Sequence, residues 1–453
     1  MIPSEFLARM RTLPGLDFEA FCTALEQPAV RGLRVNTLKT DVDTLLPLLP
    51  FAPTPIPFAQ NAFYAPEDKV GALPAHHAGM LYMQDPGAIS SVAAAEPKSG
   101  MTVLDMCAAP GGKSTQLAAA IAPDGILVAN EYVPARCRIL QGNVERLGCP
   151  RAVVTNLGSA ALADFYGSYF DLVVADVPCS GEGMFRKYEV AGEEWSPENV
   201  TQCAERGLEI LQNSAACVKP GGRLLYSTCT FAPEENELQI ARFLDEHPDF
   251  SLLPVPDEIR QNTADGISLA GIARDMSHCR RFYPHISPGE GQFLALLVRS
   301  PDAPHVAPAA SAAKQLDKQT QKIVSDFLGE VLTEIPAGKL IALRDDIYLA
   351  PDIPIPPRGV FAPGICIGTV VKGRLVPHHQ LFSALGKRFR LQLDLTQGDP
   401  RIERYLRGEE LDSPELCKNG YAAVLYASAP LGGGKAVGGR LKNHYPKGLR
   451  NRN

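Results

Sequence analysis

The middle of the chain predicts an α/β fold built on a parallel, Rossmann-like sheet. Between residues 96 and 299, apolar runs typical of buried strands alternate with amphipathic helical stretches, which indicates successive βαβ units. Two of these runs, 170–175 and 222–226, are each followed closely by a cysteine, Cys179 and Cys229. Because the carboxyl ends of parallel strands share the sheet edge where ligands bind, we expect both thiols to overhang one pocket.

The segments on either side of this core differ from it in composition. Residues 1–95 begin with a helical stretch and include a strand-like stretch, 31–39, with three cationic side chains. Residues 300–314 are rich in Pro, Ala and Ser, which is typical of a linker. We therefore predict an N-terminal region (1–95), a core domain (96–299), this linker, and a small mixed α+β domain (315–453). The strand-like run 292–298 is expected to close the core sheet.

The overall composition favours a cytoplasmic enzyme. The chain has 453 residues, 45% of them apolar, enough for two or three domains with substantial cores. No apolar run approaches the roughly 18 residues of a membrane span, and the N-terminus lacks the features of a signal peptide. The 11 cysteines are irregularly spaced and show no metal-ligand pattern, so we expect neither a disulfide framework nor a metal. The net charge of −6 argues weakly against nucleic acid, although local charge can override it.

A glycine-rich turn opens the predicted core after the strand-like run 102–106. Its residues are Cys107, Ala108, Ala109, Pro110, Gly111, Gly112 and Lys113. Such a turn brings backbone N–H groups close to a ligand. A Walker A loop is excluded, because Cys107 stands where its first glycine is required, and no GxGxxG motif is present. The turn alone fits two alternatives equally: a nucleoside pocket, as in S-adenosylmethionine (SAM) methyltransferases, or an ordinary tight βα turn.

The following strands favour the nucleoside pocket. The second strand-like run ends in Glu131, and a carboxylate at that place can accept hydrogen bonds from both ribose hydroxyls. The third run is followed by Asn156, which is a candidate for contact with the adenine.

The segment after the fourth strand indicates the reaction class. Amino-group methylases of this fold carry Asp/Asn-Pro-Pro-aromatic there, whereas this chain has Asp176, Val177, Pro178 and Cys179. A thiol in place of the aromatic ring suits a target that is activated by addition, such as cytosine, whose C5 becomes nucleophilic once a thiolate adds to C6. Asp176 is placed to hold the N3 and amino edge of such a base, and a second thiol can help to release the enzyme.

These segments resemble the Nol/Nop/Sun family of RNA cytosine-C5 methyltransferases. The resemblance is carried by residues 82–86, 105–113, 176–181 and 227–230, and the stretch 437–450 resembles the end of the bacterial 16S rRNA small-subunit methyltransferase F group. It implies a seven-stranded Rossmann-like SAM-methyltransferase core, an N-terminal RNA-binding region and a PUA-like C-terminal domain that also binds RNA.

The resemblance also implies roles for individual residues. It makes Cys229 the nucleophile and Cys179 the thiol that assists product release, and it supports SAM binding by the 107–113 turn, Glu131, Asn156 and Asp176. The implied product is 5-methylcytosine, with 16S rRNA, free or in the small subunit, as the first expectation and a monomeric enzyme. A tRNA substrate, or a non-catalytic RNA-binding assembly factor on this fold, is the alternative.

Some features leave alternatives open. DNA cytosine methylases use the Pro-Cys thiol as nucleophile, and residues 198–200 match their second signature; we favour a helix start there, with Ser196 as N-cap. Gly158 stands where many relatives carry an Asp for the adenine, which leaves that contact to Asn156 or to backbone groups. Residues 435–453 contain six Lys/Arg and no acid, and we favour an RNA-facing surface over a merely solvated tail.

Overall fold

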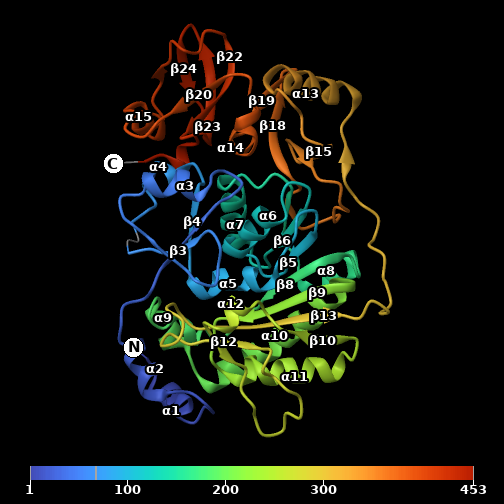
Figure 1. Cartoon of the computed structure of the whole chain (residues 1–453). Coiled ribbons are helices and arrows are strands. Elements are labelled where there is room, and N and C mark those ends of the chain that lie inside the picture. Colours follow the sequence, from blue (N-terminus) through green and yellow to red (C-terminus); the bar gives the residue numbers. More distant parts are fainter. Residues whose placement is uncertain (1, 67–68, 452–453) are drawn as a thin grey trace.

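The computed structural model describes residues 2–66 and 69–451, which form four β-sheets (Figure 1). The largest sheet has ten strands in the order β11-β12-β13-β9-β8-β5-β6-β7-β17, with β10 also paired to β13. Its five parallel strands are β5 (Thr102–Asp105), β6 (Ile126–Asn130), β7 (Ala152–Thr155), β8 (Phe170–Asp176) and β9 (Val218–Thr228). The predicted Rossmann-like α/β core is confirmed.

The strand order places a crevice where the predicted site residues lie. From β5 the chain moves outward to β6 and β7, then returns to the other side of β5 to form β8 and β9. Connections therefore diverge between β5 and β8, and ligands of open parallel sheets bind in the crevice at such a point.

Helices cover both faces of the parallel strands. Helices α6 (Gly112–Ala120) and α7 (Pro134–Arg146) pack near β5, β6 and β7, whereas α5 (Pro86–Ala95) lies beside α6 and contacts β9 and β13. Helix α10 (Pro197–Cys217) packs against β8 and β9, with α8 (Ser159–Tyr166) and α11 (Glu237–Glu246) beside it; the short helices are α9 (Glu189–Glu194) and α12 (Asp257–Arg260). The apolar strand residues between these layers, such as Leu104, Val173 and Leu224, are fully buried.

The start of α10 decides how residues 198–200 are interpreted. Ser196 is the N-cap, its Oγ accepts a hydrogen bond of 3.1 Å from Asn199 N, and Pro197 is the first helical residue. The prediction of a helix start is therefore confirmed.

One expectation about the sheet is wrong. Strand β13 (Gln292–Arg299) pairs antiparallel with β9, on the side opposite to β8, but it does not close the sheet. Both β10 (Phe250–Leu253) and β12 (Arg280–Phe282) pair with its other side, and β11 (Ala264–Asp265) follows β12. At the opposite edge, β17 (Val360–Ala362) pairs with β7, so four strands flank the five parallel strands and β13.

The N-terminal region forms a four-stranded antiparallel sheet in the order β2-β3-β1-β4. Its elements are α1 (Ser4–Arg11), α2 (Phe18–Leu25), β1 (Gly32–Val35), α3 (Val42–Leu45), β2 (Thr54–Pro55), β3 (Ala62–Tyr64), α4 (Pro74–His77) and β4 (Leu81–Gln84). Two of the three cations in its strand-like stretch, Arg34 and Lys39, are only 3% exposed. Lys39 Nζ donates to the carbonyls of Ser383 and Pro430, and burial lowers its pKa to about 7. These two side chains connect parts of the protein and are not available to RNA.

The C-terminal part contains two five-stranded sheets (Figure 1). The first comprises β14 (Lys314–Gln315), β15 (Lys339–Leu343), β16 (Asp346–Ala350), β18 (Ile365–Val371) and β19 (Arg374–Pro377), with α13 (Lys318–Val331) beside it. The second comprises β20 (Gln392–Leu395), β21 (Leu411–Asp412), β22 (Gly420–Tyr426), β23 (Ala429–Val437) and β24 (Arg440–Asn443), with α14 (His379–Leu385) and α15 (Arg401–Arg407). Strand β17 belongs by sequence to the predicted C-terminal domain but pairs with the core sheet. The boundaries at 95/96, 299/300 and 314/315 stay predictions.

The cationic C-terminal segment is folded, not a solvated tail. Residues 435–437 end β23 and residues 440–443 form β24. Tyr445 is 2% exposed, with its hydroxyl 2.9 Å from His77 Nδ1. Arg452, one of the six cations, lies outside the described residues. Within the described part of the chain, no helix is both long and apolar enough to span a bilayer.

Candidate active site

A cavity of about 400 Å³ at the carboxyl ends of β5, β8 and β9 gathers most of the predicted site residues. Its wall includes Cys107, Ala108, Ala109, Pro110, Gly112, Lys113, Asp176 and Cys229. Tyr82 and Gln84 from β4 and Tyr188 from the segment before α9 complete it, so the N-terminal region also contributes to the wall. As predicted from the parallel strands, the glycine-rich turn, Asp176 and Cys229 line one cavity.

The two thiols face one another beside this cavity. The Sγ atoms of Cys179 and Cys229 are 3.1 Å apart, and Cys229 N donates a hydrogen bond of 3.3 Å to Cys179 Sγ. The hydrogen bond to Cys229, together with burial, raises the pKa of the Cys179 thiol well above its usual value. Cys179 is therefore held as a protonated thiol next to the sulfur of Cys229.

Asp176 is held by two partners that the sequence did not indicate. Its Oδ2 lies 2.8 Å from Lys113 Nζ, and its Oδ1 accepts a hydrogen bond of 2.6 Å from Ser227 Oγ. Burial lowers the pKa of Lys113 but the charge of Asp176 raises it, and the net shift is upward. The site therefore contains a Lys–Asp ion pair that lines the same cavity as Cys229.

The glycine-rich turn is shaped by close backbone packing. Gly111 has φ of +115°, a conformation that side chains other than glycine rarely adopt. A Cβ on Gly112 would lie 3.1 Å from Gln84 Cδ, so a larger residue would push on the cavity wall. At the end of β5, Asp105 is fully buried, and its Oδ2 accepts a hydrogen bond of 2.6 Å from Ser114 Oγ. Burial raises the pKa of Asp105 to about 7.

Glu131 and Asn156 lie next to each other, away from the thiols. Glu131 is 4% exposed, its Oε1 accepts a hydrogen bond of 2.8 Å from Val133 N, and its Oε2 lies 3.6 Å from Arg136. Asn156 Nδ2 donates to the carbonyls of Glu131 (2.6 Å) and Tyr132 (2.7 Å). Asn156 thus holds the turn that carries Glu131, and the ribose and adenine contacts of these residues stay predictions.

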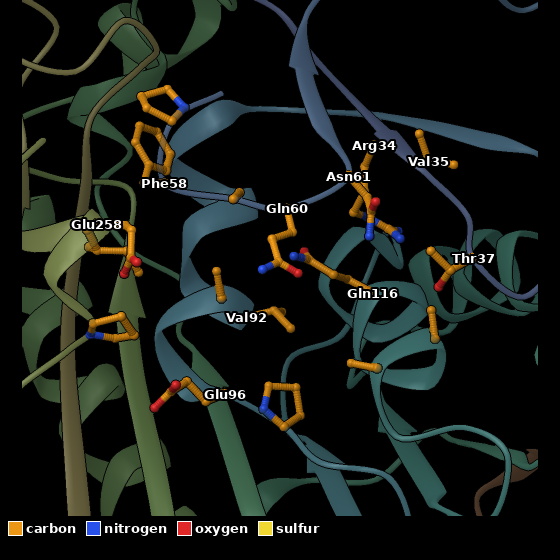
Figure 2. A pocket seen from close by; sticks show the side chains of 18 residues that line it. Arg34, Val35, Thr37, Phe58, Gln60, Asn61, Val92, Glu96, Gln116 and Glu258 are labelled. Carbon is orange, nitrogen blue, oxygen red and sulfur yellow. The ribbon is translucent and has the colours of Figure 1, made fainter. Parts of the chain in front are cut away.

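A second cavity, of about 550 Å³, has no cysteine in its wall (Figure 2 shows the residues that line it). It is lined by the N-terminal region at Phe58 and Gln60 and by α6 at Gln116, and Glu258 stands at its edge. None of the predicted catalytic or SAM-binding residues lines it. Arg34 lines it as well, and its guanidinium donates to Gly112 O (3.3 Å). We take the smaller cavity as the active site because it contains Cys229 and the glycine-rich turn.

In residues 2–66 and 69–451, no group of three or more His, Cys, Asp or Glu side chains could hold a metal ion.

Three family models match the chain in succession. They are the N-terminal domain of 16S rRNA methyltransferase RsmF (residues 2–86), 16S rRNA methyltransferase RsmB/F (92–298) and the methyltransferase RsmF PUA domain (392–451). Ribosomal RNA small subunit methyltransferase F of Vibrio parahaemolyticus is 32% identical over 478 residues, which cover 99% of this chain and 97% of that protein. The Klebsiella pneumoniae protein of the same name is 32% identical over 474 residues, 99% of this chain and 96% of its own length.

The chain belongs to the ribosomal RNA small subunit methyltransferase F family.

Solved structures agree with this assignment. A methyltransferase homolog protein from Pyrococcus horikoshii is 29% identical, with a TM-score of 0.56 and coverage of 66% of this chain and 95% of that one. NSun6 from the same organism, solved with SFG, has a TM-score of 0.56 at 20% identity, covers 67% of this chain and 99% of its own, and supports the fold alone. The family resemblance, the fold class with its PUA domain and the SAM dependence are thus confirmed.

Proposed function

We propose that this methyltransferase forms 5-methylcytosine in the RNA of the small ribosomal subunit. The observation that carries the proposal is the pair of sulfurs, of Cys179 and Cys229, that lie 3.1 Å apart at the carboxyl edge of the sheet. Cys229 lines the same cavity as the glycine-rich turn. The carbon C5 of cytosine needs such a thiol, because it becomes nucleophilic only after addition at C6.

The two thiols take different roles in the proposal. Cys229 lines the cavity and adds to C6 as a thiolate, whereas Cys179 is kept protonated by its hydrogen bond to Cys229. SAM, bound at the glycine-rich turn, supplies the methyl group to C5. Water then takes the C5 proton, the bond between C6 and Cys229 Sγ breaks, and Cys229 leaves as a thiolate. The protonated Cys179, 3.1 Å away, assists this step by donating a hydrogen bond to that thiolate.

The Lys113–Asp176 pair supports recognition of the base. Asp176 presents its carboxylate to the cavity while Lys113 and Ser227 fix its orientation. We propose that this carboxylate accepts a hydrogen bond from the amino group of cytosine and that Lys113 stabilises the negative charge that thiolate addition places on the ring.

The RNA contact is proposed on the second C-terminal sheet. Lys435 and Lys442 lie directly opposite one another on β23 and β24, both exposed, and Lys435 Nζ is 5.7 Å from the centre of the Tyr421 ring. Like charges in cross-strand register repel, so this face favours an anionic partner such as an RNA backbone. We further propose that the enzyme acts as a monomer in the cytoplasm, where ribosomal RNA is modified.

Denaturing electrophoresis with labelled 16S rRNA and SAM tests the thiol roles. Cys229→Ala is expected to abolish both methylation and any covalent protein–RNA adduct. Cys179→Ala retains the nucleophile and is expected to accumulate an adduct that survives denaturation. Cys417→Ala, which changes an exposed thiol far from the site, is the matched control and should behave like the wild-type protein. An adduct in Cys229→Ala alone would invert the roles, as in DNA cytosine methylases.

A further inference from the structure

Two buried carboxylates contact the segments that carry the thiols, and the proposed chemistry uses neither. Glu182 is 2% exposed and follows Cys179 by three residues, whereas Glu235 is 1% exposed and follows Cys229 by six. Each belongs to a short 3-10 helix that follows one of the two strands: Glu182 begins η2 (Glu182–Met184) after β8, and Glu235 ends η3 (Pro233–Glu235) after β9.

Glu235 reaches from the Cys229 segment into the Cys179 segment. Its Oε1 accepts a hydrogen bond of 2.9 Å from Ser180 N, and its Oε2 accepts one of 2.5 Å from Ser180 Oγ. The carboxylate therefore holds both the backbone and the side chain of the residue next to Cys179. Its own backbone is fixed in turn, because Tyr226 Oη donates to Glu235 O at 2.6 Å.

Glu182 reaches in the opposite direction. Its Oε2 accepts hydrogen bonds from Thr230 Oγ1 (2.9 Å) and Phe231 N (3.0 Å), the two residues after Cys229. Its Oε1 accepts a hydrogen bond of 3.0 Å from Trp195 Nε1, which fixes the carboxylate plane. Ser180 Oγ and Thr230 Oγ1 lie 2.9 Å apart, so the two segments are in contact at the hydroxyls that the two carboxylates hold.

Each cysteine segment is thus held by a carboxylate from the other. We propose that Glu182 and Glu235 are positioning residues that set the distance between the sulfurs of Cys179 and Cys229; the proposal rests on the roles assigned to these thiols above. Two buried acids are a costly way to stabilise a core, since apolar residues of similar size often serve as well or better. Unlike apolar contacts, their hydrogen bonds fix the positions of particular groups, and each acid accepts hydrogen bonds from groups within two residues of a reacting cysteine.

Rate should depend on this geometry more than binding does. A misplacement of about 1 Å can slow a positioned reaction about 100-fold. We therefore expect Glu235→Ala to lower the single-turnover rate of methyl transfer, at saturating SAM and 16S rRNA, by about 10- to 100-fold. The dissociation constants of SAM and RNA should change less than about twofold.

Two further variants separate positioning from charge and from general folding. Glu235→Gln can still accept from Ser180 N and donate to Ser180 Oγ, so it should recover the rate to within about fivefold of the wild type. Glu234→Ala is the matched control, because the Glu234 carboxylate points outward to Arg9 at 2.7 Å. An unchanged rate in Glu235→Ala, or an equal loss in Glu235→Gln, would overturn the proposal. If Glu235→Ala does not fold, Thr230→Val takes its place, because it removes the donor to Glu182. An unaltered rate of methyl transfer in that variant would contradict the positioning role of the two acids.

A measurement without RNA distinguishes this proposal from the proposed function. Oxidation by diamide joins two nearby thiols as a disulfide while the diamide is reduced, and mass spectrometry of peptides follows the Cys179–Cys229 link. The link should form at least about fivefold more slowly in Glu235→Ala than in the wild type or in Glu235→Gln. Equal rates of disulfide formation in all three proteins, or no Cys179–Cys229 disulfide in the wild type, would refute the positioning role of the two acids, whichever base is methylated. Slower disulfide formation in Glu235→Ala, together with no RNA adduct in Cys179→Ala, would instead refute the roles proposed for the thiols and leave the positioning role intact.

Discussion

Replacing the buried carboxyl group of Asp105 by an amide should remove a pH dependence from the stability of the ligand-free protein. Burial raises the pKa of Asp105 to about 7, against about 3.9 for an exposed aspartate. The difference is about three pH units, which at about 1.4 kcal/mol for each corresponds to about 4 kcal/mol.

The sign follows from where the proton is bound. Between about pH 4 and pH 7 the folded protein keeps the Asp105 proton while the unfolded chain releases it. Its contribution to stability is therefore present below pH 4, is lost as the pH rises to about 7, and stays lost above that. Asp105→Asn cannot release a proton, so its stability relative to the wild type should increase with pH across this window by about 4 kcal/mol, of which about 3 kcal/mol falls above pH 5.

Urea unfolding of both proteins from pH 5 to pH 8, without SAM, provides the test. The amide keeps an acceptor for Ser114 Oγ, but its N–H groups replace an oxygen that has no partner, so a constant offset of about 1–3 kcal/mol is expected at every pH. The change with pH is independent of that offset. A free-energy difference that stays flat from pH 5 to pH 8 would refute the account of Asp105.

Three further predictions concern SAM, RNA and the C-terminal segment. Glu131→Ala should weaken SAM binding by about 1.5–3 kcal/mol, because a charged acceptor is lost, and calorimetry that gives unchanged affinity would refute the ribose contact. The double change of Lys435 and Lys442 to Ala should reduce the slope of log K for RNA against log salt by about 1.4–1.8, with SAM binding intact; an unaltered slope would place the RNA elsewhere. Tyr445→Phe should lower the free energy of unfolding by about 0.5–1.5 kcal/mol, since its hydrogen bond to His77 is lost, whereas equal stability would make that contact incidental.

The residues of the active-site cavity could be predicted because they follow strands. Parallel strands end at one edge, so Asp176 and Cys229, far apart in sequence, were expected to meet, and β8 and β9 bring them together. Glu235 could not be predicted in the same way. It stands in an acidic run before α11, where acids ordinarily favour a helix start, and only the fold shows that its side chain turns inward to Ser180.

The C-terminal segment shows a second limit. Its cations and interleaved glycines predicted an RNA-facing surface and gave no sign of a packed strand. Strand β23, which leads into this segment, nevertheless packs so closely that a Cβ added to Gly433 would lie 2.1 Å from the Phe382 ring. A strand that packs its glycines against an aromatic ring has little apolar pattern of its own. Likewise, the burial of Lys39 depends on carbonyls at 383 and 430, which no local pattern reveals.

The central claim is that Cys229 makes 5-methylcytosine in small-subunit RNA. Bisulfite sequencing of 16S rRNA and tRNA should compare a deletion strain with the same strain carrying the wild-type gene or Cys229→Ala. We expect at least one 16S rRNA cytosine to resist conversion with the wild-type gene and to be converted both in the deletion strain and with Cys229→Ala. Protection restored by Cys229→Ala, or lost only from tRNA, would contradict the account.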